Sequence, residues 1–120
     1  RKLLIPLLGF ALAGCSSVCD QGDYEFLGKI DLGSRGATKF LVVKRGASNE
    51  EIRNVASTAC GSSRFCRLLI WDSKLYAETR FPLSERAASK QIATYINNPG
   101  RSESLIIRGV KVSMGECSNR

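Results

Sequence analysis

The stretch that decides the fold is residues 48–71, SNEEIRNVASTACGSSRFCRLLIW. Ser48 and Glu51 have the spacing of a capping box, in which each side chain accepts a hydrogen bond from the other residue's backbone N–H. The apolar positions that follow recur at helical spacing, and they are Ile52, Val55, Ala56, Ala59 and Cys60. They predict an amphipathic helix whose narrow face of small residues suits close packing on a sheet, and Gly61 is suited to end it.

Strands are predicted on both sides of this helix. Cys66-Arg67-Leu68-Leu69-Ile70-Trp71 is a nearly continuous apolar run, typical of a central strand covered on one face or both. Ahead of the helix, residues 24–32 alternate with period two, and their apolar face holds Tyr24, Phe26, Ile30 and Leu32. Residues 39–44 are a second, more apolar run. The turn residues 33–36 between the two runs predict a hairpin.

Beyond residue 71 the pattern predicts a turn at 72–74, a short return strand over 75–80 and a second helix from Ser84 to about Asn97. The inward face of that helix would hold Ala87, Ala88, Gln91, Ile92, Tyr95 and Ile96. The run Asn97-Asn98-Pro99-Gly100 stops it. Residues 104–108 predict the last clear strand, which residues 110–114 extend or bulge around Gly109.

The resulting order is β-β-α-β-(β)-α-β, which predicts a single domain of the α/β (α+β) class. Right-handed crossovers put both helices on the same side of a mixed sheet of four to five strands. We therefore expect a small two-layer sandwich, similar to a ferredoxin-like arrangement with an added N-terminal strand. A three-layer arrangement is the alternative, but two short helices cover both faces of such a sheet poorly.

The first fifteen residues have the order of a secretory signal. Arg1-Lys2 is a basic start, residues 3–11 are largely apolar, and Leu12-Ala13-Gly14-Cys15 closes the segment with small residues and a cysteine. The stretch 3–14 is shorter than the about 20 residues of a transmembrane helix. Its last four residues resemble the lipobox of bacterial lipoproteins. The resemblance implies a signal peptide at 1–14, an acylated Cys15 with a tether over 15–23, and one domain over 24–120.

In the lipoprotein family the cysteine thiol is diacylated and the new amino terminus is acylated after cleavage. Two or more acyl chains give stable membrane anchoring, since each buried methylene contributes about 0.8 kcal/mol. Ser16 and Ser17 stand where family members retained on the inner membrane carry Asp. The resemblance therefore implies a lipid-anchored envelope protein on the periplasmic face of the outer membrane. Its partner there would be membrane lipid, bound through the acylated Cys15.

The sequence has five cysteines, and lipidation would use Cys15. The remaining four, in an oxidising compartment, predict two disulfides among three possible connectivities. We favour Cys60–Cys66, across a tight loop between the helix and the strand, and Cys19–Cys117, which would join the ends of the domain. A metal or redox role is disfavoured, because the chain has no C-x-x-C pair and no histidine.

Composition excludes several classes of function. Without histidine the usual base of a Ser or Cys nucleophile is missing, and no nucleotide-binding glycine pattern occurs. Asp72 and Glu78 are the one carboxylate pair considered, and we interpret them as solvated charges. No cofactor or metal is expected. The chain has 18 Lys and Arg against 11 Asp and Glu, and residues 15–120 have 16 against 11, a net charge of +5. This charge is dispersed, which disfavours nucleic acid as a partner.

The candidate binding residues surround the loop after the third predicted strand. They are Arg67, Trp71, Lys74, Tyr76 and Arg80. Aromatic residues and arginine dominate binding hot spots. Trp71 ends an apolar strand, however, so a buried indole with its N–H bonded to a carbonyl is favoured for that residue. The outer face of the sheet, if uncovered, is the other candidate surface.

These patterns favour a non-catalytic envelope lipoprotein that binds a protein partner. Accessory subunits of secretion or conjugation machines, immunity proteins and exclusion lipoproteins belong to this class. A basic module that binds peptidoglycan or lipopolysaccharide is the alternative, supported by the positive charge. A small envelope hydrolase that uses carboxylates is a third, less favoured hypothesis.

Overall fold

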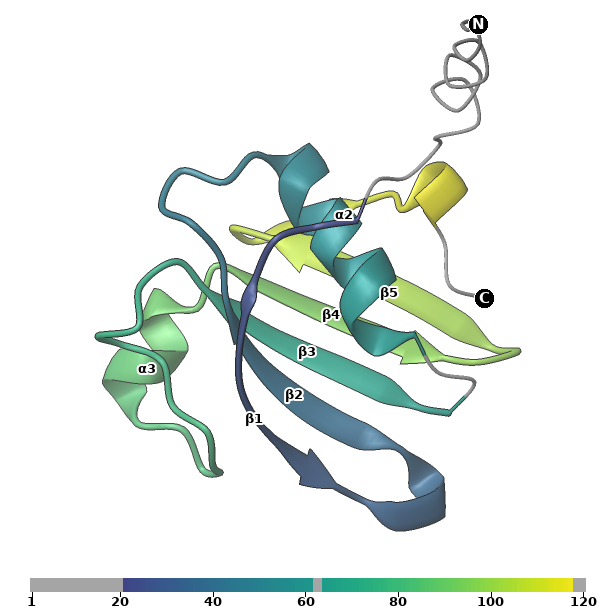
Figure 1. Cartoon of the computed structure of the whole chain (residues 1–120), viewed down its shortest axis with the longest axis horizontal. Helices are drawn as coiled ribbons and strands as arrows, with labels where there is room; N and C mark the ends of the chain where they lie inside the picture. The colour runs from purple at the N-terminus through teal and green to yellow at the C-terminus, as the bar shows by residue number, and fades with distance from the viewer. Residues whose placement is uncertain (1–20, 62–63, 118–120) are drawn as a thin grey trace, which may run out of the picture.

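The computed structural model describes residues 21–61 and 64–117, which form one six-stranded sheet in the order β1-β2-β3-β4-β5-β6 (Figure 1). Its strands are β1 (Glu25–Asp31), β2 (Ala37–Val42), β3 (Cys66–Trp71), β4 (Ala93–Asn98), β5 (Ser102–Ile107) and β6 (Val110–Val112). The helices are α2 (Asn49–Cys60) and α3 (Glu85–Lys90), and single 3-10 turns are η1 (Gly33–Arg35) and η2 (Gly115–Cys117). The chain therefore folds into the α+β domain expected, with a mixed sheet.

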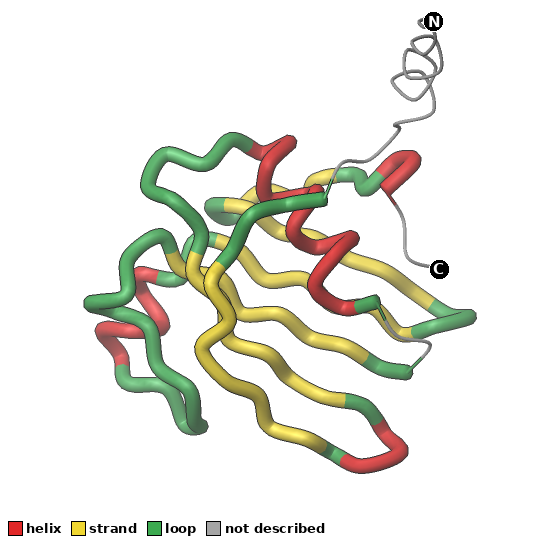
Figure 2. Tube along the Cα trace, viewed as in Figure 1, coloured by secondary structure: helices red, strands yellow, loops and turns green. Residues whose placement is uncertain are grey.

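One helical crossover makes the sheet mixed. Strands β2 and β3 are parallel, with Phe40 opposite Leu69. Between them α2 carries the chain back to the end of the sheet where β2 begins. Each of the other described strand pairs is antiparallel. The hairpin of β1 and β2 and the strand β3 thus confirm the prediction, with β2 two residues earlier than the 39–44 expected. Figure 2 shows α2 lying across one face of the sheet.

Helix α2 confirms the capping-box prediction. The Ser48 hydroxyl oxygen accepts a hydrogen bond from the Glu51 N–H at 3.1 Å, and the Glu51 carboxylate accepts one from the Ser48 N–H at 2.8 Å. The buried residues of the helix are the five apolar positions of the pattern. Gly61 follows with a φ of 49°, in the left-handed region that ends many helices.

Two glycines are required by close backbone packing, one against α2 and one between the starts of β2 and β3. A Cβ on Gly22 would lie 2.4 Å from the backbone nitrogen of Val55, so the N-terminal segment crosses α2 at backbone distance. The Gly22 N–H also donates to the Thr58 hydroxyl at 3.3 Å. Gly36, with a φ of 116°, leads into β2, and a Cβ there would lie 2.0 Å from the carbonyl oxygen of Phe65. A side chain at either position would force the backbone to move.

The two faces of the sheet carry separate cores. Leu41, Leu68 and Ile70 face α2 and pack with its small residues, and with Tyr95 and residues of β5. Their neighbours in the same strands point to the other side, where a smaller core is formed by Phe40, Leu69, Trp71 and Ala87. Because Ala87 belongs to α3, the two helices lie on opposite faces. The expectation of both helices on one face was wrong.

The topology of β3 and β4 explains this difference. The two strands are antiparallel, so the connection between them is no crossover and the rule of handedness does not apply to it. Residues 72–92 are free to fold onto the face that α2 leaves bare. Figure 2 shows α3 near the end of the sheet where β3 finishes and β4 begins.

The predicted second helix is much shorter than expected. α3 ends at Lys90, Gln91 has extended dihedral angles, and Ala93–Asn98 is strand β4 with strictly alternating burial. Ile92, Thr94 and Ile96 are β-branched, which favours a strand over a helix. The Asn98-Pro99-Gly100 run is the turn of the β4–β5 hairpin, where the Arg101 N–H donates to the Asn98 carbonyl at 2.9 Å.

Three further expectations need correction. Residues 75–80 form turns and bends instead of a return strand. Residues 110–112 form a separate strand, because Arg108 and Gly109 both take positive φ and reverse the chain, so the sheet has six strands instead of four to five. In β1 a register shift between Phe26 and Gly28 breaks the period of two. The buried side of β1 is therefore Leu27 and Ile30, while the predicted face is partly exposed at Tyr24, Phe26 and Leu32.

Candidate functional site

The sheet face opposite α2 is only partly covered. Segment 72–90 packs over Phe40, Leu69 and Trp71, at the end where α3 lies. Further along the same face the register aligns Arg67 with Ile96, and Ile106 with Lys111. Ile106 is 43% exposed. We call this uncovered part the open face, and it comprises Arg67, Phe81, Ile96, Ile106 and Lys111.

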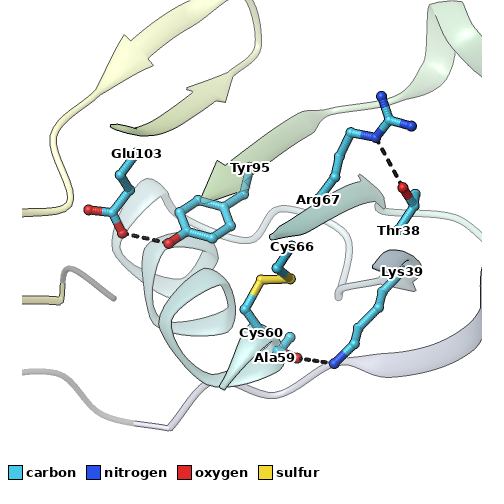
Figure 3. Close-up of a disulfide and its surroundings, with 8 residues drawn as sticks. All are labelled: Thr38, Lys39, Ala59, Cys60, Cys66, Arg67, Tyr95 and Glu103. Atoms are coloured by element: carbon cyan, nitrogen blue, oxygen red, sulfur yellow. Dashed lines mark hydrogen bonds between the residues drawn. A yellow bond between two sulfur atoms is a disulfide. The ribbon is translucent and has the colours of Figure 1, made fainter. Parts of the chain in front are cut away.

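Arg67 is the cation of the open face that two contacts hold in position. Its Nε–H donates to the hydroxyl of Thr38 at 3.2 Å, and its guanidinium carbon lies 5.0 Å from the ring centroid of Phe81. Figure 3 shows the side chain on the side of β3 opposite the Cys66 disulfide, with its two terminal nitrogens directed away from Thr38. Stacking and one hydrogen bond thus hold the guanidinium in place.

Phe81 supplies the aromatic part of the same surface. Its ring lies 5.7 Å from that of Phe40, tilted by 53°, and yet the residue is 43% exposed. Phe40 in turn stacks on the buried Trp71 at 6.4 Å. Phe81 was absent from the predicted binding residues. The one sequence signal for it is the following Pro82, which disfavours a helical conformation at residue 81 and places it in an extended segment.

Trp71 is a core residue, so its candidacy as a binding residue was wrong. The side chain is fully buried, and its Nε1–H donates to the carbonyl of Ala87 at 2.9 Å. That contact is the alternative favoured from the sequence, and it is confirmed. The indole hydrogen bond therefore links α3 to the sheet. A side chain that is fully buried in this way cannot contact a partner.

The other candidates lie in separate environments. Lys74 forms an ion pair with Glu25 of β1 at 3.0 Å, and both side chains are exposed. The ring of Tyr76 is contacted by two cations, the guanidinium of Arg86 at 4.7 Å and the ammonium of Lys90 at 5.0 Å. Arg80 is exposed in the loop. The five predicted residues therefore do not form one cluster, and only Arg67 lies on the open face.

Glu78, one of the two carboxylates named from the sequence, has a structural role. Glu78 accepts hydrogen bonds from the N–H and the hydroxyl of Ser84, at 2.9 and 2.7 Å. These two hydrogen bonds, the one from the Ser84 N–H more than the one from its hydroxyl, hold the pKa of Glu78 below its usual value. The Ser84 oxygen in turn accepts from Ala87 N–H at 3.0 Å and caps α3. Glu78 thus secures the start of a helix. Within residues 21–61 and 64–117, no group of three His, Cys, Asp or Glu could hold a metal ion.

One predicted disulfide is confirmed. Cys60 and Cys66 are joined, with their Cα atoms 5.9 Å apart, so the bond links the end of α2 to the start of β3 (Figure 3). Cys117 is buried and disulfide-bonded. Its predicted partner Cys19 lies outside the described residues, as do Cys15 and the rest of the lipobox.

A second concave surface lies where the N-terminal segment meets α2. A groove of about 610 Å³ is lined by residues 21–25, the end of β2 and the first half of α2. In its wall Lys44 and Glu51 form an ion pair at 2.8 Å. This pair raises the pKa of Lys44, mainly through the hydrogen bond to Glu51. The two charges satisfy each other, so neither is offered to a ligand.

The fold and the open face together define a small α+β domain in which α2 covers the larger core on one sheet face and segment 72–90 covers part of the other. Comparison of the chain with known protein families, with curated proteins and with solved structures found no match. Among the residues that the structure describes, no helix is long and apolar enough to span a membrane.

Proposed function

We propose that this chain is a membrane-anchored bacterial envelope lipoprotein whose domain acts as a non-catalytic protein-binding or accessory module, of the secretion, conjugation, immunity or exclusion type. The observation that carries the proposal is the open face, where Phe81, 43% exposed, contacts the guanidinium of Arg67, and Ile106, also 43% exposed, lies on the same face of β5. Aromatic, aliphatic and arginine side chains of this kind form the centres of protein interfaces.

The anchor in this proposal rests on Leu12-Ala13-Gly14-Cys15 and its resemblance to the lipobox. An acylated Cys15 would be at most about 25 Å of extended chain from Gly22, where the backbone packs on α2. Such a short tether would keep the domain near the membrane surface. We propose the periplasmic face of the outer membrane as its location, from Ser16 and Ser17 after the cysteine.

The missing histidine and the hydrogen bonding of Glu78 support the non-catalytic part of the proposal. The chain contains no histidine, and Glu78 is bonded to Ser84 with a lowered pKa, whereas a general acid needs a raised one. The hydrolase hypothesis is tested by Asp72→Asn and Glu78→Gln. Loss of a measurable cell-wall hydrolysis with an unchanged thermal transition would revive it.

Two measurements on the full chain in its native cells test the proposed function. Labelling with an alkyne fatty acid should mark the wild type and not Cys15→Ser. Chemical cross-linking followed by affinity purification of the acylated protein should recover one specific envelope protein. Labelling of Cys15→Ser would contradict the proposed lipid anchor. Failure to recover any specific protein would contradict the proposed binding role.

A basic module for peptidoglycan or lipopolysaccharide is the second candidate, favoured by one observation. Arg86 and Lys90 both contact the Tyr76 ring, and among the described residues neither forms an ion pair. Two cations on one ring are suited to a polyanionic surface. Sedimentation of the protein with purified sacculi or lipopolysaccharide tests it. Binding should fall at raised salt and in Arg86→Gln/Lys90→Gln, while the matched variant Arg35→Gln/Arg101→Gln keeps it.

A further inference from the structure

The open face carries an arginine whose donors are only partly used. Within the described part of the chain, Arg67 makes one hydrogen bond, from Nε to Thr38, and one ring contact, with Phe81. The terminal nitrogens are directed away from that hydrogen bond (Figure 3). A guanidinium that is already stacked and bonded loses little further freedom when it binds a carboxylate through both terminal nitrogens. Arg67 is therefore preorganised for an acidic group.

The strands around Arg67 place isoleucine and hydroxyl side chains on this face, and no carboxylate from β2 to β6. Ile96 lies beside Arg67 in register on β4, and Ser104 lies opposite Ile96 on β5. Ile106, two residues further along β5 on the same face, lies between Thr94 of β4 and Lys111 of β6. By the alternation of the strands, no Asp or Glu from β2 to β6 points to this face. Glu25, on the same side of β1, is paired with Lys74. The face thus presents two cations, Arg67 and Lys111, beside the isoleucines Ile96 and Ile106 and the hydroxyls of Thr94 and Ser104.

We propose that the open face is the docking site for an acidic segment of a partner protein. A carboxylate of that segment pairs with the terminal nitrogens of Arg67, and an adjacent apolar side chain packs on Phe81, Ile96 and Ile106. Lys111 adds a second, exposed cation at the edge. This inference rests on the proposed protein-binding function and names the chemistry of the partner.

The geometry favours a protein segment over a membrane surface. Lipid headgroups are held by clusters of flexible Lys and Arg that need no fixed orientation. Here one guanidinium is fixed between a hydroxyl and a ring, and a floor of isoleucine lies next to it. Bidentate pairing beside a desolvated apolar centre is the arrangement by which proteins recognise a carboxylate on another chain.

Site-specific photo-crosslinking in native cells tests the proposal. The full chain carries p-benzoylphenylalanine in place of Ile106, and a control carries it in place of Val110, an exposed residue of β6 whose side chain points to the other face. Mass spectrometry should map the Ile106 adduct to a protein segment with Asp or Glu within three residues of the crosslink. The Val110 control should not yield that adduct.

Charge variants then identify the recognising group. In the Ile106 background, Arg67→Gln and Arg67→Lys should each lower the adduct yield about tenfold, because lysine keeps the charge but loses the planar fork. Arg101→Gln, which removes one charge from the β4–β5 turn, should leave the yield unchanged. Lys111→Glu should lower the yield, while Arg101→Glu should not. Lys111 makes no described side-chain contact that folding depends on, so this pair stays informative if an Arg67 variant fails to fold.

The possible results separate this inference from the proposed function. An adduct to lipid, to a second copy of this chain or to a segment without carboxylates would overturn it, as would an adduct insensitive to Arg67 and Lys111. Absence of any Ile106 adduct overturns it too. If chemical cross-linking still recovers a specific protein in that case, the protein-binding function stands and the partner uses another face.

Discussion

The indole N–H of Trp71, at the end of β3, donates to the carbonyl of Ala87 in α3 at 2.9 Å. This bond joins the sheet to the segment that bears Phe81, because residues 72–90 leave the sheet at Trp71 and return to it at Ala87. Phe40, stacked on Trp71, also contacts Phe81. The position of Phe81 beside Arg67 therefore depends on a buried tryptophan that no partner touches.

Trp71→Phe should loosen this segment while it leaves α2 and its core intact. The variant keeps an aromatic ring but leaves the Ala87 carbonyl without its indole donor, which should cost about 1–3 kcal/mol of unfolding free energy. Urea denaturation measures the loss, and hydrogen exchange should show faster exchange in residues 72–90. The control is Leu75→Ala in the same segment, where the side chain is 74% exposed and the change should stay within about 0.5 kcal/mol. Equal losses in both variants would argue against the role given to the indole.

Gly22→Ala should detach the N-terminal segment from α2. The added Cβ would meet the backbone nitrogen of Val55 at 2.4 Å, and a helix backbone cannot move aside as a flexible side chain can. Overpacking of this kind costs about 1–3 kcal/mol. Thermal unfolding should show the loss, with Gln21→Ala as the neighbouring control that adds no atom. A wild-type transition in Gly22→Ala would show that the segment does not pack on the helix as described.

Local signals were sufficient for one half of this fold. The capping box, the apolar spacing of α2 and the run of β3 are each complete within a dozen residues, so helix and strand could be predicted from them. Residues 92–96 gave an ambiguous pattern, since Ile92 and Ile96 fit helical spacing while Tyr95 and Ala93 fit a strand. Pairing with β3 and β5 decided in favour of the strand. That pairing is a tertiary contact, which outweighs a weak local preference.

The same limit applied to the candidate site. Arg67 was among the candidates because it lies in the predicted strand that leads into the loop after residue 71, and arginine is common in binding hot spots. Phe81 was missed because its place beside Arg67 depends on how residues 72–90 fold back, and that depends on β4 being antiparallel to β3. The side of the sheet on which α3 lies depends on the same pairing. Residues close together in sequence could be predicted, and contacts made through topology could not.

Acid should weaken the start of α3 through Glu78. Its pKa is lowered from 4.5 by the N–H and the hydroxyl of Ser84, so the folded chain binds the proton less readily than the unfolded chain. The contribution of the charged group is therefore fully present above pH 4.5 and is lost as the pH falls below it. Unfolding curves of wild type and Glu78→Gln should differ at neutral pH and converge below about pH 4.5. A difference that stays constant down to the lowest pH would contradict the assignment.

The Cys60–Cys66 bond should give a non-additive pair of variants. The bond closes a short ring between α2 and β3, with a sequence separation of 6, and by the chain-entropy estimate its removal costs about 2 kcal/mol. Cys60→Ala and Cys66→Ala should each lose about that much, and the double variant little more, because both changes break the same bond. The measurement is urea denaturation of all four proteins without reductant, which leaves the bond to Cys117 untouched. Mass mapping of the non-reduced wild type should recover the Cys60–Cys66 peptide. Additive losses in the double variant, or a free thiol at either position in the wild type, would overturn the pairing and the covalent closure of the α2–β3 corner.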